Sequence, residues 1–321
     1  MSSDWKFIKS PEISFAGVPI CTNLDKLKAD IAILGVHYIS PYPQIFKNIS
    51  LTDRVEEAPA SIRRQSSIFT DHLTHHNFDF DDDTLAGKNI RLVDCGDVDR
   101  DIAKDQLDPE HITLSTRKII DEGAVPVILG TDEGSCIFAM RAYQAFKSLC
   151  VVHLDAHIDW RQERDGVKEG FSSVMRRASE MPWVESMTQI GLRGIGSART
   201  EEINDALDFG SVFIKAREVH QDGIGACLAR IPAAENYIIT IDSDVFDSAM
   251  APGVLFNTPG GLTYDETIDL FQGIAGKGKV VGLNIFELRP ERDINGFTAS
   301  AIAQLIVNFI GTIAHSGQIN S

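Results

Sequence analysis

The chain has 321 residues, of which 43% are hydrophobic and 24% are charged, and both shares are ordinary for a folded globular protein. It carries 30 lysines and arginines against 46 aspartates and glutamates, which gives a net charge of −16. This acidic balance argues against nucleic acid or an anionic membrane surface as a partner, because both are themselves negatively charged.

Short apolar runs alternate with amphipathic patterns along most of the chain. The apolar runs predict strands at residues 28–36, 90–98, 125–129, 149–155, 187–191, 211–214, 236–241 and 279–285. The amphipathic patterns predict a helix that begins near residue 58, one within 108–123, and others at 136–147, 171–180, 200–208, 222–230, 264–274 and 298–314. The acidic stretch 75–89 is expected to be a solvated loop. Strands that alternate with helices predict an α/β fold, in which helices cover both faces of a parallel sheet.

No linker and no tandem repeat divides the sequence. We therefore expect residues 1–321 to form a single domain, with residues 1–27 as an N-terminal extension. The first ten residues lack the apolar core of a signal peptide, and no stretch approaches the ~20 apolar residues of a membrane span. The five cysteines are scattered and none belongs to a CxxC pair. Together these features predict a cytoplasmic protein.

Three of the expected strands end in acidic residues. The strand at 149–155 runs into "DAHID", in which Asp155, His157 and Asp159 recur at every second position and so share one face. Glu133 follows the strand at 125–129, and Asp242 and Asp244 follow the strand at 236–241. Because ligands of parallel sheets bind beyond the carboxyl ends of the strands, we expect these side chains to meet at one site.

Five acids and one imidazole cannot all stay charged in a cleft unless cations are bound there. Oxygen ligands with an imidazole suit Mn²⁺, Ni²⁺, Fe²⁺ or Zn²⁺ better than Ca²⁺. This many carboxylates favours two ions ~3.5–4 Å apart, which would lower the pKa of a shared water. His153, inside the strand, is interpreted as a core histidine without a role in the site.

The same residues resemble the ureohydrolase family, which includes arginases, agmatinases and guanidino-acid hydrolases. "DAHID" resembles the family's DAHxD motif, and "TIDSDVFDSAMAPGVLFNTPGGLT" at 240–263 is similar to its SxDxDxxDPxxAPGxGTPxxGGL stretch. "VPVILGTDEGS" lies where the family has LGGDHS, and "IFELRPERD" at 285–293 where it has a Glu-x-x-Pro segment. The resemblance covers about residues 30–315 in the expected order.

The resemblance implies a three-layer α/β/α fold with an eight-stranded, mostly parallel sheet, assembled as homotrimers or hexamers. It also implies a hydroxide shared by two divalent ions, Mn²⁺ or Ni²⁺, that attacks a guanidinium carbon and releases urea (or guanylurea) and an amine. The implied ligands of one ion are Glu133, Asp155, Asp159 and Asp242, and those of the second are Asp155, His157, Asp242 and Asp244. Glu287 would bind and orient the substrate guanidinium.

The sequence departs from the family at informative positions. Glu133 replaces a ligand histidine, and Glu169 replaces a histidine that assists proton transfer, so Glu169 becomes the candidate proton shuttle. Trp160, directly after the metal motif, is a candidate wall of the substrate pocket, with a solvated loop as the alternative. These changes favour a small or substituted guanidine over arginine as the cationic substrate, and suggest a resemblance to ureohydrolases that act on biguanides such as metformin.

Two functions remain open from the sequence. The first is a metal-dependent amidinohydrolase. The second is a non-catalytic subunit, impaired in metal binding, that supports an active homologue in a hetero-oligomer. Glu133, Glu169 and Thr131, which replaces a glycine of the family motif, are the residues that motivate the second.

Overall fold

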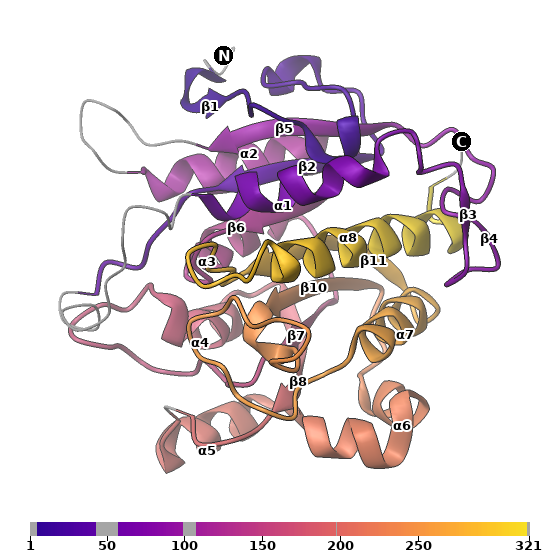
Figure 1. Cartoon of the computed structure of the whole chain (residues 1–321). Helices are drawn as coiled ribbons and strands as arrows, with labels where there is room; N and C mark the ends of the chain where they lie inside the picture. The colour runs from indigo at the N-terminus through magenta and orange to yellow at the C-terminus, as the bar shows by residue number, and fades with distance from the viewer. Residues whose placement is uncertain (1–4, 43–56, 99–106, 197, 320–321) are drawn as a thin grey trace.

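A nine-stranded β-sheet runs through the centre of the molecule, in the order β1-β5-β2-β6-β11-β10-β7-β8-β9 (Figure 1). The computed structural model describes residues 5–42, 57–98, 107–196 and 198–319. The strands of this sheet are β1 (Ile8–Lys9), β2 (Ile31–Val36), β5 (Leu92–Val98), β6 (Val125–Gly130), β7 (Leu149–Leu154), β8 (Val184–Leu192), β9 (Val212–Lys215), β10 (Asn236–Asp242) and β11 (Lys279–Phe286).

Each of the eight strands expected from the apolar runs lies in this sheet, and these strands pair in parallel. The ninth strand is β1, which pairs antiparallel with β5. Its two residues are too few to form a recognisable apolar run, which is why the sequence does not reveal it. The α/β class is confirmed, and the sheet is one short strand larger than expected.

The two faces of the sheet are covered by separate hydrophobic layers. In β2, Ile31 and Ile33 belong to one layer, while Ala32 and Leu34 belong to the other, as the period of two along a strand requires. The first layer contains side chains of α1 (Ala58–Ser66), α6 (Ala216–Arg230), α7 (Tyr264–Ala275) and α8 (Phe297–His315). The second contains side chains of α2 (Pro109–Asp121), α3 (Ser135–Met140), α4 (Val174–Ser179) and α5 (Thr200–Phe209). The architecture is therefore the expected three-layer α/β/α arrangement.

The helices differ from expectation mainly at their ends. The helix expected at 136–147 ends at Met140 and continues only as a 3₁₀ turn, Arg141–Tyr143. α6 begins at Ala216 rather than residue 222, and Gly223 interrupts it with a φ of +80°. The expected loop at 75–89 contains a two-stranded ribbon of β3 (His76–Asn77) and β4 (Asp82–Asp83). Most of the polar stretch 38–60 lies outside the described residues.

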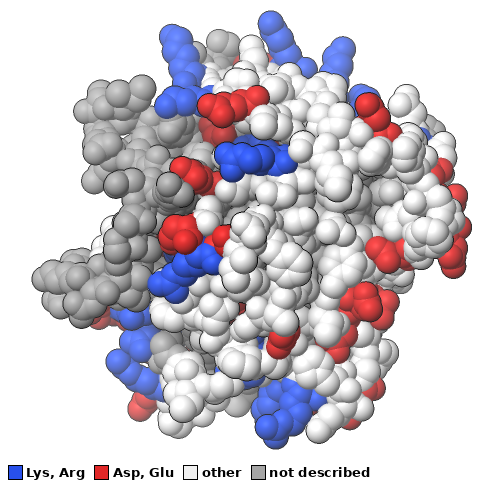
Figure 2. Space-filling model, viewed as in Figure 1, with Lys and Arg blue, Asp and Glu red and all other residues white. Residues whose placement is uncertain are grey.

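α8 corrects one expectation about the membrane. Its 19 residues are long and apolar enough to cross a bilayer by length and composition, and 78% of its most apolar window is buried inside the protein. It packs against α1 and α7, so we describe it as a core helix. On the face seen in Figure 2, lysines and arginines are scattered and form no continuous patch, while acidic side chains gather along the edge that carries β3 and β4.

The single-domain organisation stays a prediction. In its support, β1 from the expected N-terminal extension pairs with β5 of the main sheet.

Candidate metal centre

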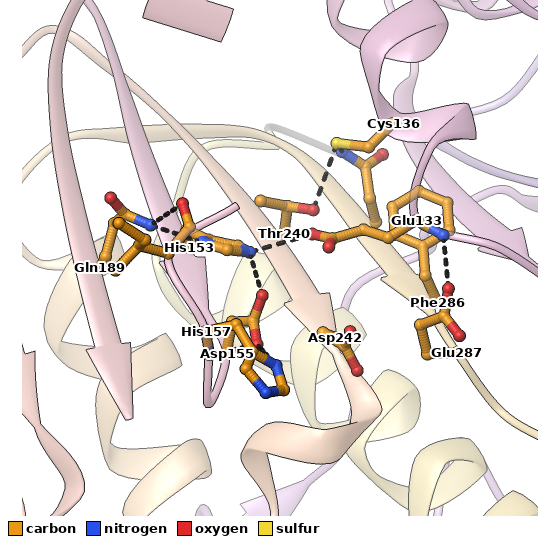
Figure 3. Close-up of polar contacts among 12 residues, drawn as sticks. Glu133, Cys136, His153, Asp155, His157, Gln189, Thr240, Asp242, Phe286 and Glu287 are labelled. Carbon is orange, nitrogen blue, oxygen red and sulfur yellow. Dashed lines mark hydrogen bonds and ion pairs between the residues drawn. The ribbon is translucent and has the colours of Figure 1, made fainter. Parts of the chain in front are cut away.

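The loop after β6 and the end of β7 bring four ligand-type side chains together, of which Figure 3 labels Glu133, His153 and Asp155. Glu133, His153, Asp155 and Asp159 each offer one ligand atom, and these atoms lie within 4.8 Å of one another. β11 and β10 lie between β6 and β7 in the sheet, so Glu133 reaches the group across two strands. Glu133, His153 and Asp155 are fully buried, and Asp159 nearly so.

A second group shares Asp155 with the first. It consists of Asp155, His157 and Asp244, whose ligand atoms again lie within 4.8 Å of one another. His157 Nδ1 is 3.1 Å from Asp244 Oδ2 and 3.3 Å from Asp155 Oδ1. Asp244 lies in the 3₁₀ turn after β10, where its backbone N–H donates to Asp242 Oδ1 at 2.8 Å. Because Asp155 belongs to both groups, the two positions are adjacent.

Asp242 and Glu287 complete the acidic cluster without joining either group of ligand atoms found in the described part of the chain. Both line the same cavity as His157 and Asp244. Glu287 Oε1 accepts a hydrogen bond from the backbone N–H of Glu133 at 3.0 Å, and its Oε2 accepts one from Arg289 at 2.8 Å. These two contacts hold the Glu287 carboxylate in one orientation.

The cluster holds more negative charge than its neighbours can balance. Burial, followed by repulsion from other carboxylates, raises the pKa of Glu133, Asp159 and Asp242 well above the usual range. Burial also raises the pKa of Asp244, to about 6. Burial opposes the protonation of His157, but its contacts with Asp155 and Asp244 prevail and raise its pKa to about 12. A bound cation would relieve this repulsion.

The donor atoms fit a divalent ion. Among the described residues, Glu133 Oε2 and Asp155 Oδ2 are buried carboxylate oxygens that accept no hydrogen bond. Such oxygens are costly to bury unless a cation or a donor compensates them. The oxygen-rich set with an imidazole nitrogen suits Mn²⁺, Ni²⁺, Fe²⁺ or Zn²⁺, as expected from the sequence.

Two residues of the cluster have unusual backbone conformations. Asp159 has a φ of +46° and Glu287 a φ of +65°, a region that non-glycine residues rarely adopt. Such strain persists only where the surroundings impose it, and it is concentrated at functional sites. β7 ends at Leu154, so the "DAHID" motif lies in the loop beyond the strand rather than along one of its faces.

A cavity of about 300 Å³ opens onto the cluster. Its acidic side is formed by His157, Asp159, Asp242, Asp244 and Glu287. The lining also includes the apolar side chains of Phe171, Leu255 and Phe256, together with the cation of Arg164. The cavity therefore offers a binding site for a small cation beside an apolar surface.

The residues expected to shuttle a proton and to form the pocket wall, Glu169 and Trp160, are not among those that line this cavity. Glu169 is 42% exposed and forms an ion pair with Arg141. Trp160 is 2% exposed, its indole N–H donates to Gln189 at 2.8 Å, and its ring packs against Phe209. The indole therefore lies behind the metal motif, and neither the pocket-wall nor the solvated-loop interpretation describes it.

His153 is the site residue that the sequence interpretation missed. Its Nε2 lies 2.9 Å from Glu133 Oε1 and 3.0 Å from Asp155 Oδ2, and its Nδ1 lies 3.1 Å from Gln189 Nε2 (Figure 3). A signal was available, because His153 precedes Asp155, His157 and Asp159 in the same period of two. The sequence alone does not assign His153 to the site, because a single histidine in an apolar strand is usually a core residue.

Comparisons with known proteins identify a family for this chain. The arginase family model matches residues 29–311. The agmatinase of Pyrococcus horikoshii is 27% identical over 244 residues, covering 76% of this chain and 81% of the agmatinase. The mitochondrial arginase of Medicago truncatula is 27% identical over 237 residues, covering 70% of this chain and 69% of the arginase.

Solved structures share the fold. The proclavaminate amidino hydrolase of Streptomyces clavuligerus superposes with a TM-score of 0.77 at 22% identity, covering 97% of this chain and 99% of that enzyme. The formiminoglutamase of Trypanosoma cruzi, solved with Mn²⁺, gives a TM-score of 0.75 at 19% identity, covering 89% of this chain and 94% of that enzyme. Because its family model spans most of the sequence, this chain belongs to the arginase family of ureohydrolases.

Proposed function

We propose that the chain is a metal-dependent amidinohydrolase that cleaves a guanidino C–N bond and releases urea (or guanylurea) and an amine. The observation that carries the proposal is the pair of adjacent ligand groups that share Asp155. Glu133, Asp155, Asp159, Asp242, Asp244 and His157 would hold two divalent ions, Mn²⁺ or Ni²⁺. Such ions, when bound, supply a water that ionises near neutral pH and a Lewis acid beside the scissile bond.

Glu287 is the residue that we assign to substrate orientation. It is nearly buried, lines the cavity, and is held by Arg289 and by the backbone N–H of Glu133. Burial raises its pKa to about 7, although Arg289 acts in the opposite direction. A bound guanidinium would favour the ionised carboxylate, which can accept two parallel N–H bonds from that planar cation. Glu287 would thereby fix the guanidinium carbon against the ion ligands.

The structure supports Glu169 as the proton shuttle less directly than it supports Glu287 in substrate orientation. Glu169, the sequence candidate, would have to leave Arg141 to reach the cavity, so it serves the reaction only if that ion pair opens. Asp159 and Asp242 already line the cavity.

The cavity favours a small or substituted guanidine over a substrate with a second cationic group. Phe171, Leu255 and Phe256 offer apolar surface to a short substituent. Arg164 lines the same cavity and forms no ion pair with a carboxylate among the described residues, so it would repel a second positive charge on the substrate. Agmatine carries such a charge at its far end, arginine carries an ammonium and a carboxylate there, and a simple alkylguanidine carries neither. A biguanide, with its charge on the guanidino group itself, remains compatible.

The test combines metal content with product formation. The full chain is expressed with Mn²⁺ and with Ni²⁺, its ion content is measured by elemental analysis, and urea release is followed across a panel of alkylguanidines, biguanides, agmatine and arginine. We expect about two ions per chain and urea from at least one substituted guanidine. Asp244→Asn should abolish urea release, whereas Asp269→Asn, on the exposed face of α7, should leave it unchanged. Two ions per chain with no product from any compound would refute the proposed reaction.

A second candidate is a non-catalytic subunit that supports an active homologue. The contact of His153 with Glu133 and Asp155 favours it, because it ties up part of the carboxylate charge without an ion. Substoichiometric metal, no activity alone, and activity restored by a co-expressed homologue would establish this role. The mass of the assembly in solution distinguishes a homotrimer or hexamer from the hetero-oligomer that the second candidate requires.

The cytoplasmic location also stays a proposal, supported by five cysteines that are all free.

A further inference from the structure

We propose that His153 is a positioning residue: a fixed Nε2–H tautomer donates a hydrogen bond to the carboxylate of Glu133 and lies against that of Asp155, and His153 does not itself bind an ion. The inference rests on the proposed function in one respect, that these two carboxylates are ion ligands. A ring nitrogen of His153 lies within 4.8 Å of ligand atoms of Glu133, Asp155 and Asp159, so distance alone does not distinguish a ligand from a hydrogen-bond donor. The hydrogen-bond partners of the ring decide between these roles.

The first step fixes the orientation of the Gln189 amide. The indole N–H of Trp160 can only donate, and it lies 2.8 Å from Gln189 Oε1. The hydroxyl of Ser211 donates to the same oxygen at 3.1 Å. Gln189 Nε2 in turn donates to the carbonyl oxygen of Ile158 at 2.8 Å. Rotating the amide by half a turn would set N–H against N–H and oxygen against oxygen, so a single orientation is possible.

The second step transfers this constraint to the histidine. The remaining N–H of the Gln189 amide points at His153 Nδ1, at 3.1 Å. A ring nitrogen that faces a donor must itself accept, so Nδ1 carries no proton and the ring proton resides on Nε2. His153 and Gln189 are both fully buried, so water does not compete for these contacts.

The third step concerns the ligand carboxylates. His153 Nε2–H donates to Glu133 Oε1 at 2.9 Å and lies 3.0 Å from Asp155 Oδ2 (Figure 3). A protonated Nε2 has no lone pair for an ion, and the lone pair of Nδ1 already accepts from Gln189. Glu133 Oε2 accepts no hydrogen bond and is left to face the ion. Trp160, Gln189 and His153 thus form a chain of donors that ends at the metal group.

Two substitutions at one position separate a donor from a ligand. His153→Phe removes the N–H and keeps the ring, whereas His153→Gln places an amide N–H where Nε2–H was. By isothermal titration with Mn²⁺, we expect about 10- to 100-fold weaker binding in the phenylalanine variant, the usual cost of losing a residue that orients a ligand. The glutamine variant should stay within about threefold of the wild type, because it restores the donor.

Three results would overturn the inference. Loss of one ion per chain in both variants would make His153 a ligand, and unchanged Mn²⁺ binding in both would mean that His153 does not position the ligands. A ring proton on Nδ1 would contradict the assigned tautomer. The last is read from ¹⁵N spectra of metal-free, histidine-labelled protein, with the signal assigned by its absence in His153→Gln. We expect the Nε2–H form in the wild type and a mixture of tautomers in Gln189→Met, which removes the N–H that faces Nδ1. If the wild type binds no Mn²⁺, the proposed function fails, while the spectra still decide the tautomer.

Discussion

Arg164 is a cation in a cavity otherwise dominated by acids. Its guanidinium lies 5.6 Å from the ring centroid of Tyr42 and 5.8 Å from that of Phe171, so two aromatic rings hold it in place. No carboxylate among the described residues forms an ion pair with it. Partial burial, with repulsion from Arg161, lowers its pKa, although Tyr42, Asp165 and Asp159 act in the opposite direction. A second cation on the substrate would be repelled where it came close to the Arg164 guanidinium.

Replacing Arg164 should therefore relax the discrimination against doubly cationic substrates. In Arg164→Gln, we expect kcat/KM for agmatine to rise about 3- to 10-fold relative to kcat/KM for a neutral-tailed alkylguanidine, since one repulsive contact at a half-exposed site has been removed. Arg164→Lys keeps the charge and is the matched control, with an unchanged ratio. A ratio that stays constant in both variants would mean that Arg164 does not face the substrate tail.

At the scale of single residues, the ligand-type side chains at the strand ends could be predicted, because acids that follow buried strands are visible in the sequence. The position of Trp160 could not, because the positive φ of Asp159 turns the chain just before it. The role of His153 depends on Gln189, a residue of β8 that is brought beside it only by the strand pairing. Contacts of that kind follow from tertiary structure rather than from local pattern.

Among the elements, the contact of α1 with β5 depends on a buried ion-pair network. Arg63 is 1% exposed and reaches Asp94 Oδ1 and Oδ2 at 2.9 and 2.8 Å and Asp97 Oδ1 at 2.6 Å. Gly35 in β2 leaves room for Asp97, because a Cβ there would lie 1.7 Å from Asp97 Oδ1. Burial raises the pKa of Asp97, but His37 and Arg63 outweigh it and the net direction is downward.

A carboxyl group with a lowered pKa stabilises the fold above its unfolded-state pKa, and this contribution is lost as the pH falls toward the folded-state value. Asp97→Asn should therefore lower the free energy of unfolding by about 2 kcal/mol at neutral pH, and the difference from wild type should shrink below about pH 4. Thermal unfolding at several pH values measures it. Asp30→Asn, whose partner Arg91 is 56% exposed, should change stability by less than about 1 kcal/mol. A difference for Asp97→Asn that is constant with pH would contradict this account.

The strands were easier to predict than the helix ends for a physical reason. A strand buried on both faces is a continuous apolar run, so β6, β7 and β10 are marked along their whole length. A helix end depends on a few backbone groups. Gly223 allows α6 to continue through a non-helical residue, whereas a glycine in the sequence usually signals an end.

For the whole molecule, the metal centre is a concentration of negative charge inside a protein whose net charge is already −16. Asp155, Asp242 and Asp244 are brought together by the pairing of β7 with β10, so folding itself creates the repulsion. Ions that bind only the folded chain would offset that cost and couple metal occupancy to stability.

Removing the ions should therefore lower the melting temperature. At an ion concentration about 1,000-fold above the dissociation constant, each bound ion contributes about 4 kcal/mol, so chelation should lower the Tm by roughly 10 °C or more in calorimetry.

Asp242→Asn should have a higher Tm than the wild type when both proteins are metal-free, because one buried charge is gone. On adding Mn²⁺, its Tm should rise by less than that of the wild type. Asp269→Asn, on exposed surface, should follow the wild type in both states. An unchanged Tm on chelation, with metal-free Asp242→Asn no more stable than the wild type, would show that the cluster is already neutralised by its own protons and hydrogen bonds.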